Sequence, residues 1–403
     1  MTYPTIMPAI TLDFANSQQL DPRVTFSRAS GATYTNSSGL IASAADHEPR
    51  FDHDPVTGEC LGLLIEESRT NFIVNSEYLE SSTGWKSVWD GATVTRTRDV
   101  TIANPSGGTG ASKIEVSRPT AENDWGAVGA NSVNTGSSGV KTVFVWLKAA
   151  TASDVGKKVS LWQYDSGFKI YRNIVLTDGW VRVNATSSSY GASVSEPLNL
   201  GLLQSSVPDS DGVTNTELSV NFYAWGAQLE EEFPTSYIPT AGSAVTRAAD
   251  IARIDGSNFT SWFNQDAGSF VATVDPGSKG GPVVGPIANG TDVSAALFLQ
   301  CYASQIRVIN YLGPGATGND LVDNSPVDGV NTFAVAGSKT ESGTVARFNG
   351  SLGTVNANRA QGQTSLFGIK IGERSGNYYC GHLSRLSYYN ERLTDAELQT
   401  LTS

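Results

Sequence analysis

Residues 142–148, TVFVWLK, decide the fold class of this chain. β-branched and aromatic residues dominate the run, which is typical of strands rather than helices. Similar short runs recur along the chain, separated by loops rich in Gly, Ser and Asn. The clearest are residues 92–95, 112–116, 159–164, 179–183 and 218–225. Short strands at this spacing predict an all-β protein built from antiparallel β-sandwiches of the jelly-roll type.

A second set of strand-like runs follows a short linker, AGSA, at residues 241–244. These runs are residues 269–274, 295–299, 305–309, 331–336, 345–350 and 366–372. Near the end, Thr394 and Glu397 have the spacing of a capping box, which predicts one short terminal helix. We therefore expect an N-terminal extended or β segment at residues 1–75. Two antiparallel β-sandwich (jelly-roll) domains follow it, at residues 76–243 and 244–403.

The composition agrees with this fold and limits the partners. The chain has 403 residues with 41 Gly and 16 Pro, which allows several domains and favours many turns. Its formal net charge of -12 opposes binding to nucleic acid, because that binding depends on clustered Lys and Arg. No run approaches the roughly 18 apolar residues of a membrane-spanning helix, and the N-terminus lacks the pattern of a signal peptide. We expect no nucleic-acid binding, no membrane insertion and no export through a signal peptide.

The three cysteines do not indicate a disulfide framework. Cys60, Cys301 and Cys380 are widely spaced and form no CxxC motif. An odd number without a close pair favours folding in a reducing cytoplasm. Cys301 and Cys380 both lie in strand-like runs, so a pairing between them stays open.

Four sequence blocks stand in order within the first 75 residues. They are residues 26–34 (FSRASGATY), 49–58 (PRFDHDPVTG), 62–67 (GLLIEE) and 69–71 (RTN). These blocks resemble the N-terminal module of many fibre and tail structural proteins of tailed bacteriophages. The resemblance implies a virion surface protein that is made in the host bacterial cytoplasm. It also implies binding to other virion proteins through residues 1–75, and a homotrimer.

Two later regions carry further resemblances. Residues 225–230 (WGAQLE) with 233–240 (FPTSYIPT) resemble the closing block of carbohydrate-binding jelly-roll modules in phage tail proteins. Residues 381–390 (GHLSRLSYYN) with 392–399 (RLTDAELQ) are similar to the last strand and helix of concanavalin A-like, laminin-G-type jelly rolls. Members of that fold often bind glycans, sometimes through calcium, and many act only as spacers.

Exposed aromatic residues are the candidates for glycan contact, because sugar rings pack their C–H faces on flat rings. Trp85, Trp89 and Trp125 lie in turn-rich sequence, so we expect them to be exposed and to be the glycan-binding residues. The other tryptophans of the central region lie inside strand-like runs, where core packing is favoured. They are Trp146, Trp162, Trp180 and Trp225.

Residues 46–75 separate the N-terminal segment from the sandwiches and are interpreted as a junction. Asp54 opens a DPVTG turn, and residues 61–65 form an apolar strand. We expect Glu66 and Glu67 to form charge-assisted bonds with Arg69 that fix the direction of the chain. The residues predicted to set the angle between attachment segment and sandwiches are Arg50, Phe51, Asp54, Glu66 and Arg69.

Three stretches of the sequence contain potential metal ligands. His47 and the consecutive residues 52–54 (DHD) are potential ligands, but consecutive residues around a turn cannot all point inward, so a hydrogen-bonded turn is favoured. The PDSDG loop at residues 208–212 lacks the full spacing of a calcium loop, which favours an Asp-Gly turn. Residues 319–320 and 323–324 lack a third fixed carboxylate. We predict no cofactor and no metal site, with calcium left open as a weak alternative.

No catalytic residues are predicted. A polysaccharide depolymerase would need two carboxylates flanking a glycosidic bond. The densest acidic run, residues 230–232, has neighbours that face opposite ways on a strand and is typical of a solvated corner. No nucleophile motif and no repeat of the β-helix kind is present in the sequence.

The sequence therefore predicts a non-enzymatic bacteriophage structural protein. It would be a tail fibre or receptor-binding component that contacts host surface polysaccharide or lipopolysaccharide. A capsid decoration or head fibre protein is the first alternative, and a polysaccharide depolymerase is the second.

Overall fold

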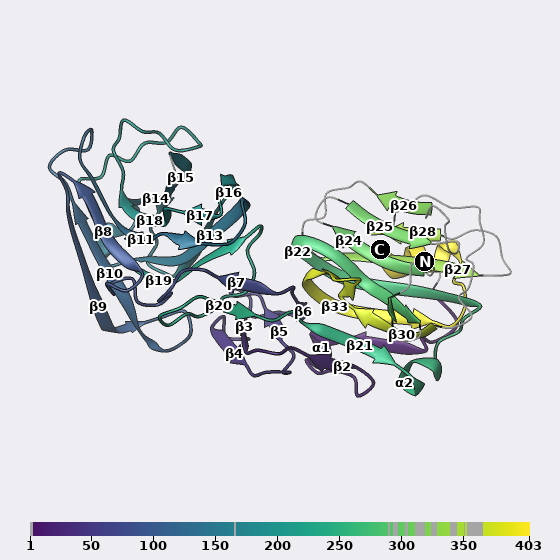
Figure 1. Cartoon of the computed structure of the whole chain (residues 1–403). Helices are drawn as coiled ribbons and strands as arrows, with labels where there is room; N and C mark the ends of the chain where they lie inside the picture. Colours follow the sequence, from purple (N-terminus) through teal and green to yellow (C-terminus); the bar gives the residue numbers. More distant parts are fainter. Residues whose placement is uncertain are drawn as a thin grey trace. The chain divides into compact units, whose positions relative to one another are not determined.

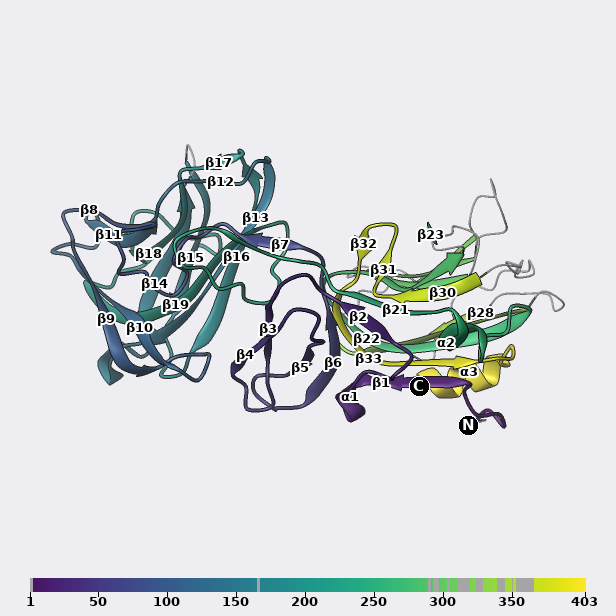
Figure 2. The same cartoon turned by 60° about the horizontal axis from the view of Figure 1, so that its bottom comes forward.

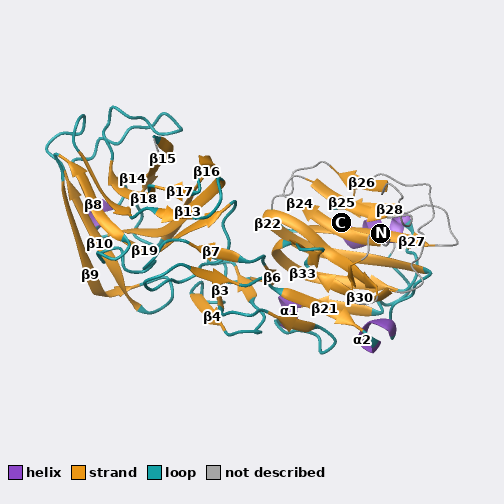
Figure 3. Cartoon of the chain, in the orientation of Figure 1, coloured by secondary structure: helices purple, strands orange, loops and turns teal. Residues whose placement is uncertain are grey.

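The computed structural model divides the chain into two compact units, which are described separately. The terminal unit combines Met1–Ser68 with Ala248–Ser403, and the central unit is Arg69–Arg247. The described residues are 3–164, 167–288, 291–292, 297–302, 305–310, 319–323, 329–338, 345–349, 351–352 and 366–403. Strands dominate both units and helices are few and short, which confirms the predicted all-β class (Figure 3).

The central unit is a sandwich of two antiparallel five-stranded sheets (Figure 1). The first has the order β16-β13-β19-β10-β9, with β16 (Val181–Tyr190), β13 (Gly139–Ala149), β19 (Ser219–Glu231), β10 (Thr109–Ser117) and β9 (Thr93–Ala103). The second has the order β15-β14-β18-β11-β8, with β15 (Phe168–Val175), β14 (Lys158–Tyr164), β18 (Glu196–Leu202), β11 (Trp125–Ala130) and β8 (Trp85–Asp90). Alternate residues of both sheets, including Val145, Leu161 and Phe222, fill the core between them.

Smaller elements complete the central unit. Strand β7 (Arg69–Asn71) pairs with β20 (Val245–Arg247), and β12 (Val133–Asn134) pairs with β17 (Ser193–Val194). A 3-10 helix at Ala152–Asp154 follows β13. The unit therefore begins and ends on paired strands.

The terminal unit is organised around the long strand β22 (Ala267–Ala288). The first part of β22, up to Asp275, pairs with β27 (Asn331–Ser338) and β33 (Cys380–Tyr389). From Gly280 it pairs with β24 (Leu297–Tyr302) and β30 (Leu366–Ile371). Between the two parts, Gly277 has a φ of +54°, a backbone angle that residues with a side chain rarely adopt. One strand thus pairs with β27 before the bend and with β24 and β30 after it.

The remaining strands of the terminal unit are short. They are β3 (Ala32–Thr35), β4 (Ile41–Ala44), β5 (Phe51–His53), β21 (Ile251–Asp255), β23 (Thr291–Asp292), β25 (Gln305–Asn310), β26 (Asn319–Asp323), β28 (Val345–Phe348), β29 (Ser351–Leu352), β31 (Glu373–Arg374) and β32 (Asn377–Tyr378). The helices are α1 (Phe14–Ser17), α2 (Ser257–Thr260) and α3 (Asp395–Thr402). Thr394 and Glu397 form the predicted capping box at the start of α3.

Most of the N-terminal strands belong to the same sheet as the C-terminal strands, whereas β3 and β4 pair with each other in a separate sheet. Strand β1 (Ile10–Asp13) pairs with β33, β2 (Thr25–Ser27) pairs with β21, and β6 (Cys60–Ile65) pairs with both β5 and β33 (Figure 2). The structure thus draws the boundaries differently from the predicted segment at residues 1–75. A segment that buries little surface alone finds its partner in the last strand of its own chain.

Two further expectations concern the whole chain. Strand β22 lies between the strands that carry Cys301 and Cys380, and the side chain of Cys301 lies outside the described residues. No helix in the described part of the chain is both long and apolar enough to cross a bilayer.

Candidate functional site

Trp85 is a core residue, so the prediction that it is exposed is wrong. It is the first residue of β8, and its side chain is 1% exposed. The indole Nε1 donates a hydrogen bond to the backbone oxygen of Asn75 at 3.1 Å. The turn-rich sequence before Trp85 ends where the strand begins, and strand alternation directs the ring into the core. Trp85 cannot contact a glycan.

Trp89 and Trp125 do not form one binding surface. Trp89 is 58% exposed at the end of β8, opposite Gly126 of β11. Trp125 is partly buried and packs edge-on against the buried Trp162, with 6.3 Å between ring centroids. Because Trp125 pairs with Asp90, the residue after Trp89, alternation places the two rings on opposite faces of the sheet. Trp89 remains as a single exposed ring.

The strand tryptophans divide into two pairs. Trp162 and Trp225 are 2% and 1% exposed, which confirms the expected packing. Trp146 and Trp180 are only partly buried. The expectation that they are core residues is therefore wrong for Trp146 and Trp180.

Trp180 belongs to a row of side chains across the outer face of the first sheet. Lys148 of β13 lies opposite Tyr223 of β19, and Tyr223 lies opposite Lys113 of β10. Directly opposed residues share one face, and their neighbours Leu147 and Phe222 point into the core. Trp180 immediately precedes β16, and its ring centroid lies 6.4 Å from that of Tyr223. Trp180, Lys148, Tyr223 and Lys113 are called the aromatic row below.

Hydrogen bonds to residues of β9 hold both rings of the aromatic row. The Tyr223 hydroxyl donates to Asp99 Oδ2 at 2.7 Å, and Trp180 Nε1 donates to the backbone oxygen of Ala103 at 2.8 Å. The Thr101 hydroxyl and the Tyr223 hydroxyl both donate to Asp99 and lower its pKa to about 2. Burial and the bond to Asp99 raise the pKa of Tyr223 to about 12. At neutral pH, Asp99 is therefore ionised and Tyr223 is protonated, and the ring orientations are fixed.

A second aromatic group adjoins the row on the same face. The Arg182 guanidinium lies 3.9 Å from the Phe144 ring centroid and 4.9 Å from that of Trp146. Trp146 packs edge-on against Trp225 and Tyr237, at 5.5 Å in both cases. Arg182 also donates to the backbone oxygen of Thr235 at 2.7 Å. Residues 233–240 thus cover the part of the face around Trp146 and Arg182. The aromatic row lies outside this group.

The acidic run at residues 230–232 has three separate structural roles. Glu230 is fully buried and accepts bonds from the backbone N–H and hydroxyl of Thr235, at 2.8 and 2.6 Å. Glu231 pairs with Lys141 at 2.7 Å, and Glu232 pairs with Arg69 at 3.0 Å. The interpretation as a solvated corner is therefore wrong for Glu230.

The predicted junction residues Arg50 and Glu66 belong to a buried ionic cluster in the terminal unit. Arg50 contacts Glu66 at 2.8 Å and Asp250 at 2.5 Å, and Arg28 contacts Asp250 at 3.1 Å. Burial alone would lower the pKa of Arg50, but the attraction of Asp250 and Glu66 outweighs it and raises that pKa. Two arginines face two carboxylates, so the charges balance inside the fold.

The other junction residues have local contacts. Asp54 accepts the backbone N–H groups of Val56 and Thr57 at 2.8 and 2.7 Å, which confirms the predicted turn. Phe51 packs against the core of the terminal unit. Arg69 belongs to the central unit and pairs with Glu232 there, whereas Glu66 pairs with Arg50. A role for these residues in setting an angle stays a prediction.

The candidate metal ligands are engaged in hydrogen bonds. Asp52 accepts from the Thr35 N–H at 2.5 Å and lies 2.8 Å from Nε2 of His382. Asp209 accepts the N–H groups of Asp211 and Val213 at 3.0 and 2.8 Å, as expected of an Asp-Gly turn. Within the described ranges, no three His, Cys, Asp or Glu side chains gather as a metal site. Asn324 of the third candidate lies outside the described residues.

Among known proteins, only solved structures are similar to this chain, and each similarity covers part of it. No protein-family model matches the chain, and no curated protein matches it. The CBM40 domain of a Ruminococcus gnavus IT-sialidase, solved with α2,3-sialyllactose, is 20% identical at a TM-score of 0.30, covering 35% of this chain and 84% of that chain. A SAP-like pentraxin from Limulus polyphemus is 15% identical at a TM-score of 0.28, covering 34% and 70%.

The binding domain of botulinum neurotoxin DC, solved with rat synaptotagmin II, is 8% identical at a TM-score of 0.30. That similarity covers 38% of this chain and 39% of the toxin chain. Similarities of this extent carry no argument about what this chain binds.

Proposed function

We propose that this chain is a non-enzymatic bacteriophage structural protein displayed on the virion. It acts as a tail fibre or receptor-binding component and contacts host surface glycans through the aromatic row of the central unit. The observation that carries the proposal is the pair of fixed rings, Trp180 and Tyr223, on the outer face of a five-stranded sheet. The buried Tyr223 lies between Lys148 and Lys113, and the partly exposed Trp180 stands at the end of the row. The phage assignment is supported by the sequence blocks in the first 75 residues.

The chemistry of the aromatic row suits a sugar. A flat indole ring accepts the C–H face of a pyranose, and the neighbouring polar groups select its orientation. Lys148 and Lys113 lie on this face beside two carboxylates, because Lys113 pairs with Glu115 at 2.8 Å and Asp99 is ionised. The charges of these four groups balance, so the rings and the mixed polar groups together suit the C–H faces and hydroxyls of a sugar. A host surface polysaccharide or lipopolysaccharide is therefore the proposed ligand class.

Weak binding at one such row would be strengthened by copy number. The N-terminal resemblance implies a homotrimer attached to other virion proteins. Three rows on one base raise the effective affinity for a repeating polysaccharide without any new contact.

The experiment that tests the glycan assignment uses the intact protein on an array of host capsule and lipopolysaccharide sugars. We expect binding to at least one host polysaccharide or lipopolysaccharide. Silence across all host sugars would contradict the proposal. Incubation with the bound polysaccharide tests the non-enzymatic part, since new reducing ends would identify a depolymerase instead.

The position on the particle needs its own experiment. Gold-labelled antibodies against the chain, viewed on whole virions by electron microscopy, are expected to mark the tail. Labelling of the capsid faces would replace the tail assignment with a decoration or head fibre protein.

A further inference from the structure

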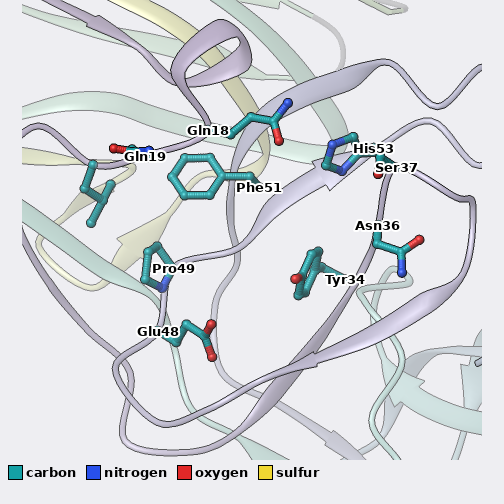
Figure 4. A pocket seen from close by; sticks show the side chains of 10 residues that line it. Gln18, Gln19, Tyr34, Asn36, Ser37, Glu48, Pro49, Phe51 and His53 are labelled. Atoms are coloured by element: carbon teal, nitrogen blue, oxygen red, sulfur yellow. The ribbon is translucent and has the colours of Figure 1, made fainter.

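A pocket of about 530 Å³ lies in the terminal unit, far from the aromatic row in sequence. Its walls come from the end of α1, from β3 and the turn after it, and from β5 (Figure 4). A pocket of about 300–1,000 Å³ is the usual size for a small-molecule site. The phage resemblance assigns this part of the chain to virion attachment and gives it no ligand.

Two aromatic rings line the pocket. Tyr34 of β3 and Phe51 of β5 are both partly exposed, and both side chains face the pocket in Figure 4. Phe51 is held in place because it also packs against the hydrophobic core of the terminal unit. Two aromatic rings in one pocket suit a ligand that is itself flat or has a C–H face.

His53 supplies a buried acceptor in the pocket wall. Its side chain is 5% exposed, and its Nδ1 lies 3.1 Å from the backbone oxygen of Thr35. A carbonyl only accepts, so Nδ1 carries the proton and, in the neutral ring, Nε2 is an acceptor. Among the described residues, Nε2 has no hydrogen-bond partner. A buried acceptor without a donor is destabilising, and a ligand hydroxyl would satisfy it.

The charges of the pocket exclude an anionic ligand. Of the lining residues, Glu48 is the acidic one and none is Lys or Arg. A carboxylate or phosphate would meet the charge of Glu48 with no cation to balance it. The side-chain amides of Gln18 and Asn36 offer both donors and acceptors, which match the hydroxyls of a sugar.

We propose that this pocket is a second binding site, for a neutral, hydroxyl-rich sugar. A sugar ring packs against Tyr34 and Phe51, and one hydroxyl donates to Nε2 of His53. The site belongs to the terminal unit, whereas the aromatic row belongs to the central unit. It does not require the aromatic row to bind glycans.

The histidine content of the chain gives a direct readout. The chain has three histidines, so the imidazole region of its NMR spectrum holds three sets of signals. The variants His47→Gln and His382→Gln assign the His53 signals by elimination. The full chain is then titrated with glucose, galactose, N-acetylglucosamine and lactose, to concentrations above about 1 mM, where weak sugar sites saturate.

At least one neutral sugar is expected to shift the His53 signals while the exposed His47 signals stay in place. Glucuronate and tetramethylammonium are expected to leave His53 unchanged, because glucuronate repeats the charge of Glu48 and tetramethylammonium has no hydroxyl to donate to Nε2. The proposal fails if no neutral sugar shifts His53, or if only glucuronate or tetramethylammonium does. Tetramethylammonium binding alone would mark the pocket as an aromatic cation site.

Matched tyrosine variants locate the binding. Tyr34→Ala is expected to weaken the titration by about tenfold, the loss of one ring contact. Tyr3→Ala removes an exposed tyrosine of the same unit and is expected to leave the titration unchanged. Equal titrations for both variants would place the sugar elsewhere and overturn the proposal. Trp180→Ala should also leave the sugar titration of the His53 signals unchanged. This variant therefore distinguishes binding at the pocket from binding at the aromatic row.

Discussion

Single residues determine the stability of the terminal unit through the buried cluster around Asp250. Asp250 contacts both Arg28 and Arg50, and all three side chains are fully buried. A charge left unpaired in this environment is far more costly than an exposed one. The cluster joins residues 28–66 to residue 250, so it links distant parts of the chain.

Asp250→Ala is expected to destabilise the terminal unit by about 3–5 kcal/mol, because it leaves two buried arginines short of a carboxylate. The control is Asp21→Ala, which breaks the partly exposed pair with Arg23 and is expected to cost at most about 1 kcal/mol. All three histidines lie in the terminal unit, so loss of their NMR signals in urea measures its unfolding. Equal midpoints for the two variants would contradict the role of the cluster.

Asp99 makes the central unit sensitive to acid. Its pKa is about 2 in the folded chain against an ordinary value of 3.8. A lowered carboxyl pKa contributes stability above pH 3.8, and that contribution is lost as pH falls towards 2. Asp99→Asn should therefore show a smaller fall in stability between pH 4 and 2 than the unchanged chain. Tryptophan fluorescence measures it, because every tryptophan except Trp262 lies in the central unit. Identical acid profiles would contradict the prediction.

At the scale of elements, the chain shows which features a sequence can and cannot reveal. Strand runs, the Asp54 turn and the capping box depend on neighbouring residues, so local patterns predict them. The sequence pattern does not predict which face of β13 packs into the core. Phe144 and Trp146 alternate with Val143 and Val145, so both faces are apolar. Which face is the core depends on the second sheet. The row around Trp180 was missed for this reason.

Strand β6 tests whether the N-terminal segment is integral to the terminal unit. Gly62 of β6 has a φ of +109°, and a Cβ there would lie 2.7 Å from Cα of Ser384 in β33. Gly62→Ala should separate the two strands and destabilise the unit by more than the ~1 kcal/mol of backbone strain alone. Gly376→Ala, also at positive φ but with open space around it, should cost only that strain. The NMR signals of His382, opposite Leu64, measure the difference in urea. Similar midpoints would contradict the pairing.

At the scale of the whole molecule, the central unit is an insertion in the terminal unit. The sequence predicted three consecutive parts, since pairing between residues near 10 and residues near 388 leaves no local signal. The ends of the insertion meet on the terminal unit. The backbone N–H of Glu66 donates to Oδ2 of Asp250, and the backbone N–H of Asp250 donates to the backbone oxygen of Glu66, both at 2.9 Å. Removing residues 1–75 would therefore take strands from a sheet as well as any attachment surface.

A chain with Arg69–Arg247 replaced by a short Gly-Ser linker is expected to fold. The ends to be joined are already adjacent, and closing a short loop costs little entropy. The expected result is three dispersed sets of histidine signals at the positions of the full chain. Collapsed signals would show that the terminal unit depends on the central one.

The central claim, that the aromatic row binds host glycans, is tested most directly by comparing Trp180→Ala with Trp89→Ala on the polysaccharide that the intact protein binds. Trp180 lies in the row, and Trp89 is the more exposed ring on the other sheet. We predict that Trp180→Ala weakens binding by about tenfold or more, as loss of one ring contact implies, and that Trp89→Ala leaves it unchanged. Undiminished binding by Trp180→Ala, with or without loss in Trp89→Ala, would contradict the account.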